Sequence, residues 1–170
     1  MIQKKHLELF YSDVICQDKK IMQIVFPLGV IFKRLEKYEY SLLAKYDLTH
    51  TQLQVLMILL FNYEKEGNYQ MSPTQLYEAM VFSSGGMTKI LKKLEEKQYI
   101  SRVSSDTDKR NKLVKLELKG LSEIQTIRTL LINTFNDFFD VLDDDEQEVL
   151  GKIYKKLVFS FFDSDDKIDC

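Results

Sequence analysis

Apolar residues recur at helical spacing through most of the chain, and this periodicity predicts a mainly α-helical protein. The first long run starts at Ile21 and consists of Ile21, Val25, Leu28, Ile31, Phe32, Leu35, Tyr38 and Leu42. Pro27 falls inside the run, so the helix either starts near Pro27 or is kinked there. The pattern predicts a long helix that ends near Tyr46, preceded by residues 1–16 with only weak periodicity.

Two further helices are marked by capping boxes, in which Ser or Thr is followed three residues later by Gln or Glu. Thr49 and Gln52 form the first pair, and apolar positions then continue to the break at Glu66-Gly67-Asn68. Ser72 and Gln75 form the second pair, with a proline at the first helical position between them. This helix is expected to be short and to end near Phe82.

A fourth helix, from residue 84 to about 97 with Ser83 as its cap, is predicted to have two distinct faces. Its apolar face holds Met87, Ile90, Leu91 and Leu94. Gly85, Thr88, Lys89 and Lys92 lie on the opposite face, with Lys93 at its margin. Glycine costs about 1 kcal/mol relative to alanine inside a helix. We therefore expect Gly85 to allow close approach of a ligand, and Gly86, to one side, to allow close helix packing.

Short strands and two more helices complete the predicted elements. "YISRVSS" and "KLVKLEL" are rich in β-branched and apolar residues and flank the polar turn "DTDKRN", which predicts a β-hairpin. From Leu121 onward, apolar periodicity predicts two helices, the second capped near Asp143 or Asp144. The acidic run 143–145 is expected to complement the positive end of that helix rather than to bind metal.

Charge is distributed unevenly along the chain, although the net charge is only −2. Residues 83–120 contain ten Lys or Arg against five Asp or Glu, whereas residues 121–170 contain five against twelve. Neutralising DNA phosphates requires clustered cations, so the basic segment is a candidate DNA-binding region. A solvent-exposed helix face is the alternative explanation for such a run.

Other kinds of chemistry have little support in the sequence. Cys16 and Cys170 are far apart, and His6 and His50 have no cluster of potential ligands nearby, so we expect no disulfide framework and no metal site. No nucleophile motif or Gly-rich phosphate loop is present, and we expect a protein that is not an enzyme and needs no cofactor. The sequence has no signal-peptide pattern and no apolar run near 18 residues, which predicts a cytoplasmic protein that does not contact membranes.

The order of elements, with an outward basic helix followed by a hairpin, is that of a winged helix-turn-helix. The sequence resembles the MarR (multiple antibiotic resistance regulator) family in three stretches, "LTHTQLQVL", "SSGGMTKILKKLEEKQYISR" and "DTDKRNKLVKLELKG". The wing motif, Asp108-x-Arg110, is the most specific of them. Two positions depart from the family pattern: Gln98 replaces a frequent Gly, and Glu117 replaces a frequent capping Thr.

This resemblance implies a mainly α protein with a small β-hairpin wing, acting as a homodimeric transcriptional regulator, more often a repressor, on a pseudo-palindromic operator. It implies an N-terminal extension and dimerisation helix in residues 1–46, a DNA-binding lobe in 47–120, and C-terminal dimerisation helices in 121–170. The residues expected at the DNA are Ser72, Thr74, Ser84, Gly85, Thr88, Lys89, Lys92, Lys93, Lys109, Arg110 and Lys112.

Within this set, Thr88, Lys89 and Lys92 are expected to face the major groove, and Ser84 and Lys93 the phosphates. The resemblance places the wing arginine, Arg110, in the minor groove. Ser72 and Thr74 begin a helix whose amide groups often hold a phosphate, although capping alone explains Ser72.

Two further expectations concern the wing and a regulatory ligand. Asp108 is expected to pair with Arg102 and hold the wing against the preceding helix. The resemblance also implies a small-molecule effector cavity between the dimerisation helices and the lobe, with Phe32, Tyr38 and Met57 as candidate lining residues. An alternative function is a winged helix that docks on other proteins and does not bind DNA.

Overall fold

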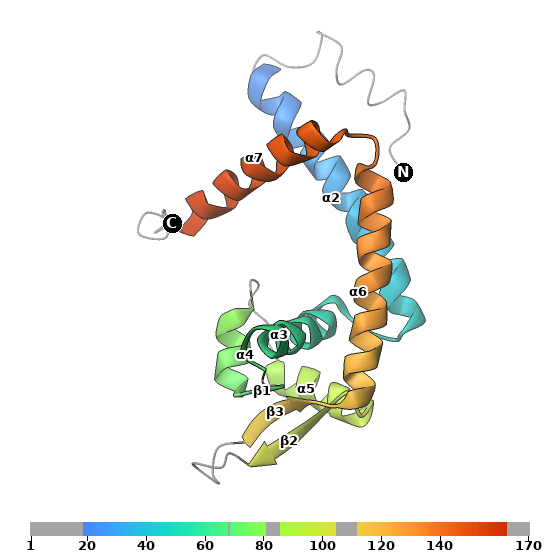
Figure 1. Ribbon diagram of the computed structural model, residues 1–170, viewed down its shortest axis with the longest axis vertical. Helices are drawn as coiled ribbons and strands as arrows, with labels where there is room; N and C mark the ends of the chain where they lie inside the picture. Colours follow the sequence, from blue (N-terminus) through green and yellow to red (C-terminus); the bar gives the residue numbers. More distant parts are fainter. Residues whose placement is uncertain (1–18, 68, 81–85, 105–111, 163–170) are drawn as a thin grey trace. The chain divides into compact units, whose positions relative to one another are not determined.

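The computed structural model describes residues 19–67, 69–80, 86–104 and 112–162 (Figure 1). The chain divides into two compact units, Met1–Ile127 and Arg128–Cys170. The described elements are α2 (Lys19–Lys45), α3 (His50–Glu66), β1 (Gln70–Met71), α4 (Pro73–Ala79), α5 (Met87–Glu96), β2 (Ile100–Ser104), β3 (Lys112–Leu116), α6 (Leu118–Phe139) and α7 (Asp144–Phe162). The expected mainly helical fold with a small hairpin is confirmed.

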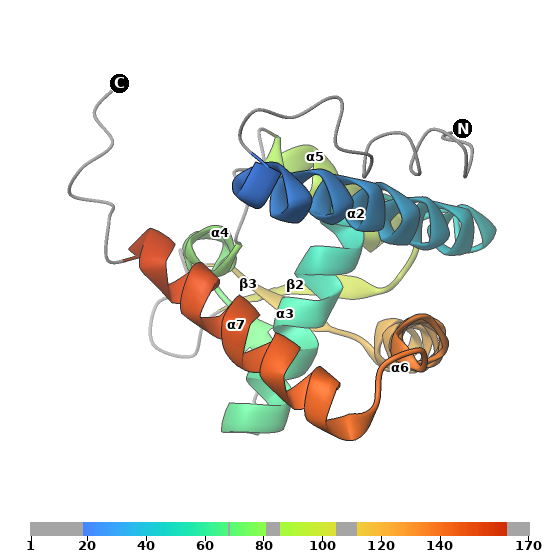
Figure 2. The ribbon, with the colours of Figure 1, turned by 90° about the horizontal axis from the view of Figure 1, so that it is seen from above.

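Helix α2 begins at Lys19 and continues through Pro27 to Lys45, so the proline lies inside the helix and does not start it. A tight turn follows, in which Asp47 has a φ of 50°. Helix α3 leaves this turn in a clearly different direction (Figure 2). A hydrogen bond between the Glu39 carboxylate and His50 Nδ1 connects the two helices across the turn.

Helix α3 supplies much of the buried core of the first unit. Leu53, Val55, Leu56, Leu59 and Leu60 from this helix are all less than a tenth exposed. Residues from the other elements complete the core, namely Leu76, Leu91, Leu94, Tyr99, Ile100, Val114, Leu116, Ile124 and Ile127. The small helices and the sheet are thus held together mainly by burial of aliphatic side chains around α3.

Both predicted capping boxes are present. The Thr49 hydroxyl accepts a hydrogen bond from the Gln52 amide at 3.3 Å, and Gln52 Oε1 accepts one from the Thr49 amide at 2.9 Å. Ser72 and Gln75 make the same reciprocal pair at 3.1 and 2.8 Å. Helix α4 ends at Ala79, earlier than predicted, because Met80 already has an extended backbone.

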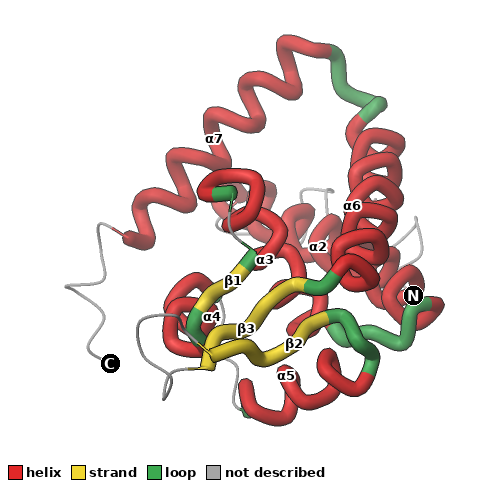
Figure 3. The backbone as a smooth tube through the Cα atoms, turned by 60° about the horizontal axis from the view of Figure 1, so that its bottom comes forward, coloured by secondary structure: helices red, strands yellow, loops and turns green. Residues whose placement is uncertain are grey.

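The hairpin is part of a three-stranded antiparallel sheet with strand order β1-β3-β2 (Figure 3). Strands β2 and β3 pair with Arg102 opposite Val114 and Ser104 opposite Lys112. Strand β1 pairs with the other edge of β3 and was not predicted, because two residues are too few to show an alternating pattern. The sheet closes one side of the α3 core.

The second unit contains the end of α6 and all of α7. Asp143 caps α7 with another reciprocal box, in which its Oδ1 accepts from the Glu146 amide at 2.9 Å and its own amide donates to Glu146 Oε2 at 3.0 Å. Asp144, Asp145 and Glu146 lie in the first turn, as expected for acidic residues that complement the helix dipole. None of the described helices combines the length and the apolarity required to cross a membrane.

The start of α6 lies very close to the start of β2. A Cβ atom on Gly120 would lie 2.2 Å from the backbone oxygen of Tyr99. The same oxygen accepts a hydrogen bond from the Glu117 amide at 3.0 Å. Because the opposing atom belongs to the backbone, a side chain at Gly120 would have to separate α6 from the strand.

We therefore expect Gly120→Ala to lower the free energy of unfolding by about 1–3 kcal/mol, the usual cost of overpacking. Gly151→Ala is the matched control, because Gly151 is also helical and no described residue lies within 4 Å of an added Cβ. This control should be neutral or stabilising by roughly 1 kcal/mol. Urea denaturation of both variants checks the prediction, and equal stabilities would show that the close contact is not a constraint.

Candidate nucleic-acid interface

The helix predicted to contact DNA begins later than expected. Helix α5 starts at Met87, and Gly86 is its N-cap with a φ of 94° and a ψ of 30°. The predicted start at residue 84 with Ser83 as cap is therefore wrong, because a left-handed residue ends any helix that approaches from the N-terminal side. Ser83, Ser84 and Gly85 lie outside the described residues.

The expected role of Gly86 in helix packing is also wrong. Among the residues that the structure describes, nothing lies within 4 Å of a Cβ atom built at this position, so close approach of another described helix does not select glycine there. The positive φ does select it, because residues with a side chain are strained in this conformation. The Gly86 carbonyl then accepts from the Lys89 and Ile90 amides at 2.8 and 3.1 Å, which starts the helix.

Helix α5 has the two faces that the sequence predicted. Leu91 and Leu94 are buried in the core, and Met87 and Ile90 are half-buried. The exposed residues include all four described members of the predicted DNA-contacting set on this helix, namely Thr88, Lys89, Lys92 and Lys93. The assignment of individual residues to bases or phosphates remains a prediction.

One exposed acidic residue shares this face and did not enter the prediction. Glu96 follows Lys92 and Lys93 by four and three residues, so it lies on the same side of the helix. A carboxylate there opposes binding to phosphates, although its place at the last helical position keeps it away from the N-terminal end of α5.

The hairpin lies beside α5 and presents a further cation. Strand β2 runs alongside α5 (Figure 3). Lys112 is exposed at the outer end of β3, where it pairs with Ser104. The other wing residues in the prediction, Asp108, Lys109 and Arg110, lie outside the described residues.

The partner that the structure gives Arg102 is Glu95 of α5, with 3.2 Å between Arg102 Nε and Glu95 Oε2. The predicted pairing with Asp108 lies outside the described residues, but the predicted effect, a tie between the wing and the preceding helix, is provided by Glu95. Sequence reasoning missed Glu95 because Asp108 is the acid nearer to the wing tip. The signal that was available is its position next to Leu94, at the edge of the buried face of α5.

At the base of the hairpin, both departures from the MarR pattern are accommodated. Gln98 adopts the left-handed conformation with a φ of 62°, as a glycine would, and its amide donates to the Glu95 carbonyl at 2.8 Å. The Glu117 carboxylate accepts from the Ser101 hydroxyl at 2.5 Å, in addition to the backbone bond from its amide to Tyr99. Both residues therefore take part in the contacts that close the base of the hairpin.

The same region joins α5, β2 and α6 through polar contacts around Tyr99. Burial, followed by the nearby Glu123 carboxylate, raises the pKa of Tyr99 to about 12, and its hydroxyl donates to Glu123 Oε1 at 3.2 Å. Lys119 Nζ donates to the Lys97 carbonyl at 2.9 Å, and Lys97 Nζ in turn lies 2.7 Å from Asp47 Oδ2. These contacts fix the C-terminal end of α5 relative to the start of α6.

At the start of α4, the Ser72 hydroxyl is occupied by the capping bond to Gln75, and Thr74 is exposed. The structure thus gives Ser72 a structural role that does not depend on DNA. Thr74 remains a predicted contact, because its exposed side chain is free to approach a phosphate.

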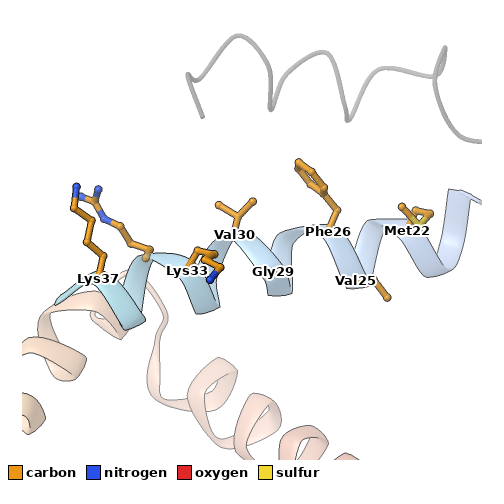
Figure 4. Close-up of a pocket in the computed structure, with 8 residues that line it drawn as sticks. Met22, Val25, Phe26, Gly29, Val30, Lys33 and Lys37 are labelled. Atoms are coloured by element: carbon orange, nitrogen blue, oxygen red, sulfur yellow. The ribbon is translucent and has the colours of Figure 1, made fainter. Parts of the chain in front are cut away.

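The residues expected to line an effector cavity do not come together around a described pocket. Phe32 and Tyr38 are 60% and 41% exposed on α2, and Met57 is half-buried on α3. Tyr38 accepts a hydrogen bond from Arg34 Nη2 at 3.0 Å. A hollow along α2 has a different lining, in which the described residues are Met22, Val25, Phe26, Gly29, Val30, Lys33, Arg34 and Lys37 (Figure 4).

A metal site has no candidate ligands in the part of the chain that the structure describes, since no group of three or more His, Cys, Asp or Glu side chains gathers there. Cys16 and Cys170 lie outside the described residues. The exposed face of α5 offers lysine and threonine side chains for ionic and hydrogen-bonding contacts.

The left-handed cap of α5 leads to a prediction about Gly86. Gly86→Ala should lower the free energy of unfolding by about 1–2 kcal/mol, because a Cβ disfavours the left-handed conformation by that amount. Gly86→Asn is the control, since asparagine tolerates this conformation better than alanine. Thermal or urea unfolding of the two variants checks the order, and a more stable alanine variant would contradict the role assigned to φ.

Comparison with known proteins shows which of them this chain is similar to. Residues 31–127, more than half of the chain, match the family described as transcriptional regulator SarA/Rot. The HTH-type transcriptional regulator SarZ of Staphylococcus haemolyticus is 30% identical over 142 residues, which cover 83% of this chain and 90% of SarZ.

Solved structures share the fold. Wild-type MarR from E. coli in its apo form aligns with a TM-score of 0.63 and 21% identity over 79% of this chain and 95% of MarR. A mutant MepR from S. aureus bound to an oligodeoxyribonucleotide aligns with a TM-score of 0.56 and 18% identity over 81% of this chain and 96% of MepR. These likenesses confirm the MarR-like winged helix, and the family match shows that this chain belongs to the SarA/Rot family of transcriptional regulators.

Proposed function

We propose that this protein regulates transcription in the cytoplasm by binding an operator in double-stranded DNA as a homodimer. The observation that carries the proposal is the exposed face of α5, where Thr88, Lys89, Lys92 and Lys93 stand on a helix anchored by buried leucines. Such a helix fits the major groove, in which lysine and threonine side chains contact base edges and phosphates. Lys112 supplies a further cation from the adjacent hairpin.

Related proteins support a DNA partner. MepR, which shares the fold, is bound to an oligodeoxyribonucleotide in its structure, and the curated relatives are HTH-type transcriptional regulators. We infer repression as the mode of action, since MarR is described as a multiple antibiotic resistance repressor. The alternative of a protein-docking winged helix without DNA binding offers no explanation for the clustered lysines.

Dimerisation is proposed from the apolar residues that the single chain leaves exposed. On α7, Val149, Ile153 and Leu157 follow one another at four-residue intervals and are 54%, 50% and 48% exposed. On α2 the exposed apolar residues are Ile21, Ile24, Val25, Leu28 and Phe32. Apolar stripes of this size are typical of interfaces. A two-fold axis would place two α5 helices about 34 Å apart, one turn of DNA.

We propose that a small molecule acts by changing the spacing of the two lobes, with Phe32, Tyr38 and Met57 as candidate contacts. These residues lie on α2 and α3, the helices that meet at the turn before the lobe.

Selection of bound DNA from a random pool with the purified protein tests sequence-specific binding. We expect an enriched pseudo-palindrome and an affinity that falls steeply with salt, because phosphate contacts release counterions. Recovery of no preferred sequence would contradict the proposal.

Lys89→Ala and Lys93→Ala are a matched pair of variants. They test whether Lys89 contacts bases in the major groove and Lys93 contacts phosphates. Lys89→Ala should change which operator variants bind best, by roughly 1–3 kcal/mol at the affected base pair. Lys93→Ala should weaken binding to all variants alike, since a phosphate contact carries no sequence information. Binding measured on a panel of single-base operator variants checks both, and uniform losses in both variants would place α5 on phosphates only.

We expect light scattering to give twice the 20.1 kDa of one chain. Ile153→Glu should lower the mass towards one chain, because a charge at an apolar interface is costly. Ile153→Leu is the control and should leave the mass unchanged. A concentration-independent mass of one chain for the unmodified protein would contradict the dimer.

A further inference from the structure

The ion pair between Arg102 and Glu95 joins the two elements that the proposed function brings to DNA. Arg102 belongs to β2 and Glu95 to α5, and 3.2 Å separates Arg102 Nε from Glu95 Oε2. The side chains are only 31% and 32% exposed, respectively. A pair that is partly shielded from water is screened less by salt than one on an open surface.

Strand alternation explains why these two side chains meet. Ile100, Arg102 and Ser104 lie on the same face of β2, because successive side chains point to opposite faces. Ile100 is buried and Arg102 pairs with the buried Val114, so the inner end of this face is directed to the core. Its outer end is open to solvent, since Arg102 and Ser104 are exposed residues. Leu91 and Leu94 of α5 are buried in the same core. Glu95 follows Leu94 directly, at the edge of the helix face that approaches β2.

Glu95 therefore differs from its neighbour Glu96, although the two have the same chemistry. Glu96 is exposed on the lysine side of α5, whereas Glu95 is half-buried and directed to the sheet. Any carboxylate on a DNA-contacting helix opposes phosphate binding through its charge. The ion pair with Arg102 is a favourable electrostatic interaction that opposes this repulsion for Glu95. Glu96 does not form this pair with Arg102.

We propose that Glu95 is a positioning residue for the wing, which sets the place of the hairpin relative to α5 through Arg102; this inference rests on the proposed DNA binding. Arg102 lies two residues before Ser104, which pairs with Lys112. At about 3.3 Å per residue, the ion pair holds the strand about 7 Å from the hairpin end that bears Lys112. Glu95 thereby fixes the separation between Lys112 and the lysines of α5.

Arg102 lies only two positions from Ser104 at the outer end of β2. The ion pair therefore restricts where this end of the hairpin lies. At the base of the hairpin, Tyr99 and Glu117 are held by a backbone hydrogen bond and by α6. Beyond Ile100, the ion pair of Arg102 with Glu95 joins β2 to α5. Losing it should let the outer part of the hairpin move relative to α5 while the base stays in place.

The experiment measures binding of the full chain to the operator obtained from the random pool, by fluorescence anisotropy. Glu95→Gln should lower the affinity about threefold to fivefold, the range expected for loss of such a pair. Glu96→Gln is the matched control, because it removes the same charge from the same helix. It should raise the affinity or leave it unchanged, so only Glu95→Gln is expected to weaken binding.

Combining Glu95→Gln with Lys112→Ala distinguishes a positioning role of Glu95 from a general loss of stability. Lys112→Ala should cost less affinity in the Glu95→Gln background than in the unmodified protein, and the same amount in the Glu96→Gln background. Glu95→Asp, which keeps the charge, should recover part of the affinity and of the coupling. It also provides a second variant if Glu95→Gln alters folding.

The outcomes are distinguishable from failure of the proposed function. If the unmodified protein selects no DNA sequence, the proposed function is wrong and the inference is overturned with it. If it binds its operator but Glu95→Gln behaves as Glu96→Gln does, or Lys112→Ala costs the same in every background, only the positioning role of Glu95 is overturned.

Discussion

The close approach of backbone at Tyr99 is the constraint on which the arrangement of the lobe depends. Its amide donates to the Leu94 carbonyl at 3.0 Å, its carbonyl accepts from the Glu117 amide, and Gly120 packs against that carbonyl. One residue thus joins the end of α5, the start of β2, the end of β3 and the start of α6. The side chain adds a hydrogen bond to Glu123 on α6. Movement of α6 at this point is consequently transmitted to α5 and to the hairpin.

Glu95 and Arg102 extend this constraint towards the proposed DNA-binding face of α5. The backbone junction fixes the base of the hairpin, and the ion pair connects its outer half to α5. The first connection depends on backbone sterics and burial, which are insensitive to salt, whereas the second is electrostatic. The base of the hairpin is thus held by backbone contacts and its outer half by an ion pair, and the exposed Lys112 lies on the outer half.

Much of this fold follows from local sequence signals. The capping boxes at Thr49 and Ser72 predict two helix starts correctly, because their hydrogen bonds join residues only three apart. The two faces of α5 follow from periodicity alone. The start of α5 was misplaced because a glycine pair is compatible both with a weak helix turn and with a left-handed cap, and only the backbone conformation of Gly86 decides between them. The partner of Arg102 depends on how strand and helix pack, which periodicity does not specify.

Strand β1 has a consequence for the order in which the chain can fold during synthesis. Its two residues pair with β3, opposite Lys115 and Val114, and not with the nearer strand β2. The capping bonds of α3 and α4 join residues three apart and involve no later residues. On a ribosome, these capping contacts can form as soon as they emerge, whereas β1 stays an unpaired edge until β3 has been made. An unpaired edge strand invites contacts with other chains. The shortness of β1, which hid it from sequence analysis, limits that hazard in the nascent protein.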